Sequence, residues 1–214
     1  MKRLYLTILY VYLMRLFLKL IVGIRYHNKE ALKKNKQFIV VSNHNSHLDS
    51  LALLSALSSS QIANTHPVAA GDYFGQSPMR AYFTRIFTNA ILIPRSAIKG
   101  GQNPIRMMSS AISKGSSLIL FPEGSRGEPE KMQEFKKGVG LLLKMHPEIP
   151  FIPVFMKGMG RVLPKGERMF VPFDTYVCFG EPRHCKTNNV DDIVSEIEQS
   201  IIELAENSFV KLQN

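Results

Sequence analysis

A histidine and an aspartate five residues apart are the first side chains in this sequence whose types and spacing suit catalysis. His44 and Asp49 lie in the run NHNSHLD at residues 43–49. An imidazole can remove a proton from a hydroxyl group if a second group fixes its tautomer and stabilises the imidazolium that forms. Asp49 could do this for His44, and the pair is therefore a candidate for general-base chemistry.

The same run has other interpretations. Ser46 before an apolar stretch is typical of a helix N-terminus, and Asp49 could simply complete a capping box with it. That helix would leave His44 in the loop ahead of it, where the positive helix end favours the neutral imidazole that a base needs. A metal cluster of His44, His47 and Asp49 lacks an evident fourth ligand, and we predict no metal site. Because such a His–Asp pair is expected by chance in about one chain in seven, the run needs corroboration.

A second candidate lies in the loop at residues 121–127, FPEGSRG, which follows a strand-like apolar run. Its glycines allow the backbone to come close to a ligand, and the guanidinium of Arg126 can grip a phosphate through two hydrogen bonds. The carboxylate of Glu123 could accept a hydrogen bond from a substrate hydroxyl. The alternative is an ordinary polar turn with a Glu–Arg surface pair.

The charge of the chain favours an anionic partner, because 27 Lys and Arg residues outnumber 17 Asp and Glu residues. Residues 190–214 hold six of the acidic residues and one of the basic ones, so the remainder carries a net charge of +15. Such a field attracts acidic lipid head groups, phosphorylated substrates or nucleic acid. The basic residues are scattered and the aromatic residues form no nucleic-acid motif, so we expect no nucleic-acid partner.

The composition is that of one globular domain. Of the 214 residues, 45% are hydrophobic and 21% are charged, and no linker rich in Pro, Gly or Ser divides the chain. Cys178 and Cys185 match no metal-ligand spacing, and two cysteines do not make a disulfide framework in a chain of this length. We interpret them as reduced structural thiols.

Residues 4–24 form an apolar stretch that as a helix would extend about 31 Å, enough to span a bilayer. One face of this helix carries the side chains of Tyr5, Tyr12, Arg15 and Lys19. The opposite side carries Leu6, Leu13, Phe17, Leu20 and Ile24. A basic stripe opposite an apolar face is typical of a helix lying in the head-group region, so Arg15, Phe17 and Lys19 are predicted to contact the membrane. A spanning helix and a helix packed on the protein's own core are the alternatives.

Short β-branched runs alternate with helical patterns along the rest of the chain. We expect strands near residues 38–41, 66–70, 90–93, 117–121, 151–156 and 170–179. Helices are expected near residues 48–57, 78–87, 104–113, 135–145 and 190–212. This alternation predicts a single α/β domain with a largely parallel or mixed central sheet flanked by helices. An N-terminal amphipathic membrane-associated helix, residues 1–26, would precede this domain, residues 27–214.

The two candidate runs each follow an expected strand, and in α/β sheets the loops at the carboxyl ends of strands build the site. Together they resemble the glycerolipid acyltransferase family, whose type members are 1-acylglycerol-3-phosphate acyltransferases. Two weaker blocks occur in the expected order. Residues 91–95, ILIPR, resemble the family's intermediate block that ends in arginine, and residues 149–154, IPFIPV, resemble its proline-containing strand. The resemblance covers roughly residues 38–156, and four blocks in order are more specific than any one of them.

The resemblance implies a role for each matching residue. His44 would be the general base and Asp49 the residue that orients it. The phosphorylated acceptor would be bound by residues from two of the blocks, namely Arg95, Glu123, Gly124, Ser125 and Arg126. Ser125 stands where threonine is common, which preserves the hydroxyl group, and the Gly127 position often holds serine.

The expected reaction moves a fatty acyl group from acyl-CoA or acyl carrier protein to the free hydroxyl of a lysophospholipid. The acceptor is expected to be 1-acylglycerol-3-phosphate, giving phosphatidate, with another lysolipid as the alternative. No cofactor is expected beyond the acyl co-substrate. Direct transfer without an acyl-enzyme agrees with the absence of a G-x-S-x-G motif. Met107 and Met108 are candidates for the lining of an acyl-chain groove, or for ordinary core positions.

Two functions of other classes stay open at this point: a catalytically inert, basic membrane-binding protein, and a hydrolase that uses the His–Asp pair on water. An anionic phospholipid membrane is the expected surface partner. The two thiols, the basic residues after the apolar helix and the intracellular acyl donors indicate peripheral or monotopic attachment at the cytoplasmic face.

Overall fold

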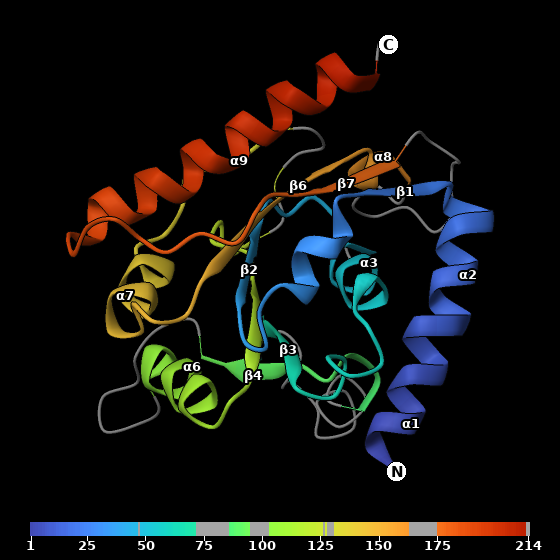
Figure 1. The fold of residues 1–214 in the computed structure, drawn as a ribbon, viewed down its shortest axis with the longest axis horizontal. Helices are drawn as coiled ribbons and strands as arrows, with labels where there is room; N and C mark the ends of the chain where they lie inside the picture. The colour runs from blue at the N-terminus through green and yellow to red at the C-terminus, as the bar shows by residue number, and fades with distance from the viewer. Residues whose placement is uncertain are drawn as a thin grey trace.

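The computed structural model describes residues 1–46, 48–71, 86–94, 103–125, 127, 131–162 and 175–212. Within these residues the chain forms an α/β domain of three layers, with a central sheet between two groups of helices (Figure 1). The predicted fold class is confirmed.

The sheet is mixed, with a parallel majority. In spatial order its strands are β1 (Ile24–His27), β7 (Thr175–Phe179), β6 (Phe151–Lys157), β2 (Ile39–Ser42), β5 (Ser117–Leu120), β3 (Thr65–Ala70) and β4 (Ile91–Ile93). The strands from β6 to β4 run parallel, β6 and β7 are antiparallel, and β1 is parallel to β7. Because β2 and β5 are parallel neighbours, their carboxyl ends lie at the same edge of the sheet.

Alternating apolar side chains give the sheet a core on each face. In β2, Val40 faces one core, and Ile39 and Val41 face the other. The first core is covered by the N-terminal helix and by α3 (Leu48–Ala56), η3 (Lys29–Lys33) and α8 (Met159–Val162). The second is covered by α6 (Pro104–Ser113), α7 (Gly138–Met145) and α9 (Val190–Leu212), which Figure 1 shows on the other side of the sheet.

Most predicted elements are present, and their ends have physical causes. α6 has its predicted bounds because the side chain of Asn103 accepts hydrogen bonds from two backbone N–H groups of the first turn and Pro104 follows it. α7 begins three residues later than predicted because the backbone N–H of Lys136 donates to the carbonyl of Pro122 (2.9 Å). The predictions for residues 78–85 and 170–174 lie outside the described residues.

The sequence interpretation missed β1. This strand pairs in parallel with β7, from Ile24 opposite Thr175 to His27 opposite Cys178. The division predicted after residue 26 therefore falls inside a strand of the sheet. The helix before it already ends at Val22, where Gly23 takes a left-handed conformation with φ of +74° that suits glycine.

The N-terminal helix is continuous from Lys2 to Val22. It consists of α1 (Lys2–Leu6), a π-helical stretch η1 (Thr7–Met14), α2 (Arg15–Phe17) and a second π-helical stretch η2 (Leu18–Val22). Its 21 residues, with a mean hydropathy of 1.8, are long and apolar enough to cross a membrane by length and composition. One face nevertheless packs on the protein's own core through Leu6, Tyr10, Leu18 and Val22.

The structure gives Arg15 and Phe17 contacts within the protein, and their predicted membrane contacts stay predictions. Nε and Nη2 of Arg15 donate to the backbone carbonyls of Ser55 and Leu57, each at 2.8 Å. These carbonyls lie at the C-terminal end of α3, where a helix leaves acceptors unsatisfied and its dipole attracts a cation. Phe17 is partly buried and packs against the same core. Lys19 is exposed, and its contact with a membrane stays a prediction.

The outer face of this helix is apolar. Five side chains spaced four residues apart are 47% to 69% exposed, and we refer to them as the exposed stripe: Leu4, Ile8, Tyr12, Leu16 and Leu20. Leu20, which had been predicted to share the apolar face with Leu6, lies on the opposite side from it. An apolar strip of this length on a protein surface suggests membrane association.

Replacement of Arg15 by methionine should destabilise the fold by about 2 kcal/mol, because two hydrogen bonds from a charged donor are lost. Urea unfolding of the detergent-solubilised protein, followed by circular dichroism, measures the change. Lys19→Met is the matched control, since Lys19 is exposed on the same helix. Equal losses in the two variants would show that Arg15 does not hold the end of α3.

Candidate active site

The two candidate loops meet at one edge of the sheet. The loop of residues 43–46 follows β2 and the loop beginning at Phe121 follows β5, and Val41 of β2 pairs with Leu120 of β5. The backbone N–H of Gly127 donates to the carbonyl of His44 (3.1 Å), which ties the second loop to the first. Parallel pairing therefore brings together side chains that are some eighty residues apart in sequence.

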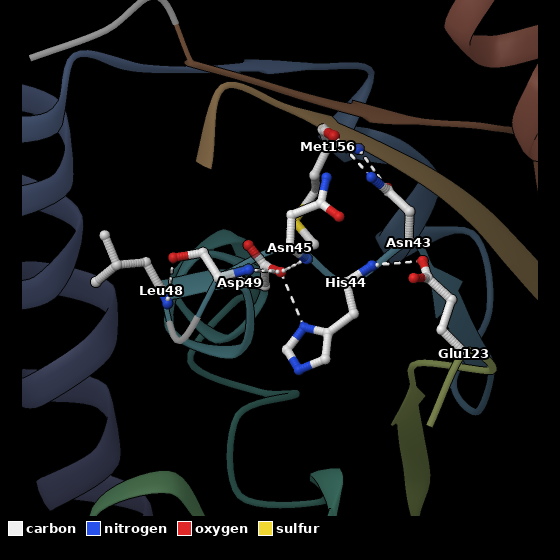
Figure 2. A network of polar contacts seen from close by, with 8 residues as sticks. Asn43, His44, Asn45, Leu48, Asp49, Glu123 and Met156 are labelled. Atoms are coloured by element: carbon white, nitrogen blue, oxygen red, sulfur yellow. Dashed lines mark hydrogen bonds and ion pairs between the residues drawn. The ribbon is translucent and has the colours of Figure 1, made fainter. Parts of the chain in front are cut away.

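A single carboxylate oxygen organises the first loop (Figure 2). Oδ2 of Asp49 lies 2.9 Å from Nδ1 of His44 and accepts hydrogen bonds from the backbone N–H groups of Asn45 and Ser46, both at 2.8 Å. Asp49 lies in the first turn of α3 and is fully buried. Two backbone donors and the positive end of a helix stabilise its charge.

The two interpretations of Asp49, as a helix cap and as the partner of His44, both apply. Its bond from the N–H of Ser46 is the returning half of a capping box, and the Ser46 hydroxyl accepts from the N–H of Leu48 (3.3 Å). The same Oδ2 faces the imidazole. The start of the helix thus fixes the carboxylate that contacts the imidazole of His44, while His47 lies outside the described residues.

The imidazole of His44 is held on two sides. Because a carboxylate accepts at Nδ1, that nitrogen carries the proton and Nε2 carries the lone pair. The ring also stacks on Phe121, with ring centroids 4.1 Å apart and planes at 21°. Figure 2 shows the second ring nitrogen directed away from Asp49. The arrangement presents a fixed proton acceptor to whatever lies beyond Nε2.

Asn43 and Glu123 hold the backbone of the same loop. The side-chain amide of Asn43 donates to the carbonyl of Met156 and accepts from its N–H, both at 2.8 Å, which anchors the end of β2 to β6. Oε1 of Glu123 accepts from the backbone N–H of His44 (2.9 Å). Asn43 and Glu123 therefore hold the main chain of the loop and make no hydrogen bond to the imidazole of His44.

The predicted contact between Glu123 and the acceptor does not agree with its placement. Glu123 is 2% exposed, its carboxylate faces the main chain of His44, and it is not part of the cavity wall described below. Burial raises the pKa of this carboxyl, and the hydrogen bond from the N–H of His44 partly offsets the rise. Glu123 is therefore a positioning residue for the His44 loop.

A cavity of about 710 Å³ lies in front of the imidazole. One part of its wall is apolar and comes from β3, β4 and α6, with Pro67, Val68, Ile93, Ile105 and Met108. The other part is polar and comes from the two loops and the segment before α7, with His44, Gly124, Ser125 and Lys136. An apolar chain attached to a polar, reactive end fits this division.

The placement of the remaining predicted residues is mixed. Gly124 and Ser125 line the cavity, and their contact with the acceptor stays a prediction, whereas Arg95 and Arg126 lie outside the described residues. Met108 lines the cavity and also belongs to the second core, so the structure is compatible with both of its predicted places. Sequence reasoning assigned no part to Lys136, although the run FKKG at residues 135–138, which begins eight residues after the second loop, was a signal for a basic residue there.

Neither cysteine forms a disulfide, and both lie outside the cavity wall. Cys178 is buried in β7. Burial raises the pKa of the Cys185 thiol to about 11, with a further rise from the nearby Glu196. A thiol with so high a pKa is a poor nucleophile, which agrees with the interpretation of both as structural.

Comparison with known proteins agrees with the geometry. Residues 23–157 match the family model Acyltransferase. A 1-acyl-sn-glycerol-3-phosphate acyltransferase from Limnanthes douglasii is 29% identical over 175 residues, which cover 80% of this chain and 58% of that protein. The human 1-acyl-sn-glycerol-3-phosphate acyltransferase alpha is 27% identical over 166 residues, which cover 74% and 54%. The crystal structure of the 1-acyl-sn-glycerophosphate acyltransferase PlsC from Thermotoga maritima superposes with a TM-score of 0.76 at 22% identity, covering 96% of this chain and 81% of that one.

The chain therefore belongs to the acyltransferase family, because the matched segment includes both loops of the site and more than half of the chain. The Thermotoga structure shares its fold. The chain spans 34% to 58% of the length of curated relatives that it matches.

Glu123→Gln should make the protein relatively more stable as the pH rises. The pKa of Glu123 is raised above its unfolded value of 4.5, so the stability that its proton provides is present below that value and is lost as the pH rises through the raised pKa. The amide of the variant still accepts from the N–H of His44 without a buried charge. Urea unfolding at about pH 5 and about pH 8 measures the difference from wild type, which should grow with pH.

The exposed Glu134 supplies the control Glu134→Gln, for which no such growth is expected. A difference between Glu123→Gln and wild type that stays constant with pH would mean that Glu123 is not buried as a costly charge.

Proposed function

We propose that this chain transfers a fatty acyl group from a thioester to the free hydroxyl of 1-acylglycerol-3-phosphate and so forms phosphatidate. The observation that carries the proposal is the 2.9 Å contact between Nδ1 of His44 and Oδ2 of Asp49, with His44 in the wall of a largely apolar cavity. The Limnanthes and human relatives are by name acyltransferases for this acceptor. Membership of the acyltransferase family supports the reaction type.

In the proposed mechanism the acceptor hydroxyl donates to Nε2 of His44 and attacks the carbonyl carbon of the thioester. Its proton passes to Nε2, and Oδ2 of Asp49 stabilises the imidazolium through Nδ1. The tetrahedral intermediate collapses as the C–S bond breaks, and the thiolate takes the proton from Nε2. The products are an ester and a free thiol, with no covalent acyl-enzyme.

The two ends of the cavity suit the two parts of such substrates. Each methylene of an acyl chain gains about 0.8 kcal/mol when it leaves water for an apolar surface such as that of Ile93, Ile105 and Met108. The polar end holds the base and the loop that carries Ser125. The donor in this proposal is acyl-CoA or acyl carrier protein, both of which present the acyl group as a thioester.

We place the protein on the cytoplasmic face of an anionic phospholipid membrane, with the N-terminal helix in the interface rather than across the bilayer. One face of that helix packs on the domain, while the exposed stripe is free to enter the acyl-chain boundary. The exposed Lys19 adds a cation near the head groups. The acyl donors and the free thiols support an intracellular face.

His44→Ala should abolish phosphatidate formation, and Asp49→Asn should lower kcat by about 10³–10⁴-fold, because the amide no longer holds the required tautomer. Free thiol and phosphatidate are quantified together for purified protein with acyl-CoA or acyl carrier protein and lysophosphatidate. Thiol release without phosphatidate would indicate a hydrolase, and retained transfer in His44→Ala would remove the mechanism.

Asp49 also caps α3, so a structural loss must be separated from a catalytic one. Ser46→Ala is the control, because it removes the hydroxyl that caps Leu48 and leaves the His44–Asp49 contact in place. It should lower the melting temperature by a few degrees, as expected for about 1 kcal/mol, and keep kcat near wild type.

Leu16→Gln combined with Leu20→Gln should lower binding to anionic vesicles by at least about tenfold, since two apolar side chains leave the stripe. Co-sedimentation with vesicles that contain phosphatidylserine measures the binding. Leu141→Gln is the control, because Leu141 is 42% exposed on α7, on the other face of the sheet. Unchanged sedimentation of the double variant would contradict docking through the stripe.

A further inference from the structure

Lys136 lines the cavity but lies outside both candidate loops, in the segment that leads into α7. It precedes α7, and its backbone N–H donates to the carbonyl of Pro122 in the loop after β5 (2.9 Å). This bond fixes the start of the Lys136 side chain beside that loop. Lys136 lines the same cavity as His44, Gly124 and Ser125.

The position of the Lys136 side chain gives a physical reason for Gly124. A Cβ added at Gly124 would lie 2.5 Å from Nζ and 3.0 Å from Cδ and Cε of Lys136. The lysine therefore crosses the face of the glycine and occupies the space that any other side chain would need. Gly124 also has φ of +72°, which disfavours other residues. Its small size makes room for an ammonium group within the loop.

The ammonium of Lys136 makes no ion pair within the part of the chain that the structure describes. The next residue, Lys137, is different, because it pairs with Asp191 at 2.7 Å on the surface. The carboxylate of Glu123 belongs to the same loop, but it is buried against the main chain of His44. A cation that has no ion pair among the described residues, in the wall of a cavity and beside the proposed base, attracts an anionic group of a bound substrate.

We propose that Lys136 binds the phosphate of the acceptor and that Gly124 keeps the space in which its ammonium does so. This inference rests on the proposed function. The phosphate of a 1-acylglycerol-3-phosphate is two carbon atoms from the hydroxyl that His44 activates, so one small polar wall can hold both. The phosphates of CoA or of a carrier protein lie at the far end of a pantetheine arm, many bonds from the reacting carbonyl. As a flexible point charge, Lys136 contributes attraction rather than a fixed bidentate geometry.

Equilibrium binding tests the inference apart from turnover. In the His44→Ala background, lysophosphatidate and the phosphate-free 1-monoacylglycerol are titrated into the detergent-solubilised protein by calorimetry. Lys136→Met should raise the Kd for lysophosphatidate about tenfold or more and leave that for monoacylglycerol within about twofold. Lys136→Arg should keep most of the affinity, because it keeps the charge. Lys137→Met, the matched surface lysine, should have no effect.

Gly124→Ala provides a second route to the same result, because its Cβ displaces the ammonium. It should weaken lysophosphatidate binding as Lys136→Met does, and the double variant should be little worse than either single one. Thermal melts of each variant identify any loss of folding. Equal loss of affinity for both ligands, or additive effects of the two substitutions, would overturn the inference.

Steady-state kinetics with His44 in place shows whether Lys136 binds the phosphate of the acceptor or a phosphate of the acyl donor. Lys136→Met should raise KM for lysophosphatidate about tenfold and leave KM for acyl-CoA near wild type. A rise confined to KM for acyl-CoA would assign Lys136 to the donor and contradict the proposal. Wild-type protein that forms no phosphatidate would contradict the proposed function itself, and the binding data would still decide the part played by Lys136.

Discussion

The site depends on one oxygen atom, Oδ2 of Asp49. It accepts hydrogen bonds from the Nδ1–H of His44 and from two backbone N–H groups of the same loop, so the imidazole tautomer and the loop conformation are set together. The aspartate belongs to the first turn of α3, whose positive end stabilises its charge. The same carboxylate thus caps the start of α3 and orients the imidazole of His44, so a change to one of these contacts affects the other.

This arrangement requires two strand ends at the same edge of the sheet. β2 delivers His44 and β5 delivers Glu123, and parallel pairing puts the Glu123 carboxylate within 2.9 Å of the His44 main chain. Burying that carboxylate is unfavourable, as its raised pKa shows. In return, Oε1 of Glu123 accepts the hydrogen bond from the partly buried N–H of His44. A small loss of stability thus secures the loop that carries the base.

Most elements and both loops of the site could be predicted from the sequence, because their signals lie in neighbouring residues. The cap and proline at the start of α6 and the apolar runs of β2 and β5 mark elements through neighbouring residues alone. Partners distant in sequence were not predictable in the same way. Helical spacing shows that Arg15 and Lys19 share a face, but only the packing of the helix on α3 decides that Arg15 meets the carbonyls of Ser55 and Leu57. The partner of Glu123 was not predictable either, because a motif gives the place of a residue in the sequence and not the group that its side chain contacts.

Gly124 shows how the two kinds of information combine. From sequence alone, a glycine in such a loop indicates that some group comes close to the backbone. The structure identifies that group as the side chain of Lys136, supplied by the segment that leads into α7. In the proposed mechanism, proton transfer depends on α3 through Asp49, and the proposed phosphate binding depends on the segment before α7 through Lys136. Because the two tasks lie on helices that cover opposite faces of the sheet, acceptor affinity can change without disturbing the tautomer of His44.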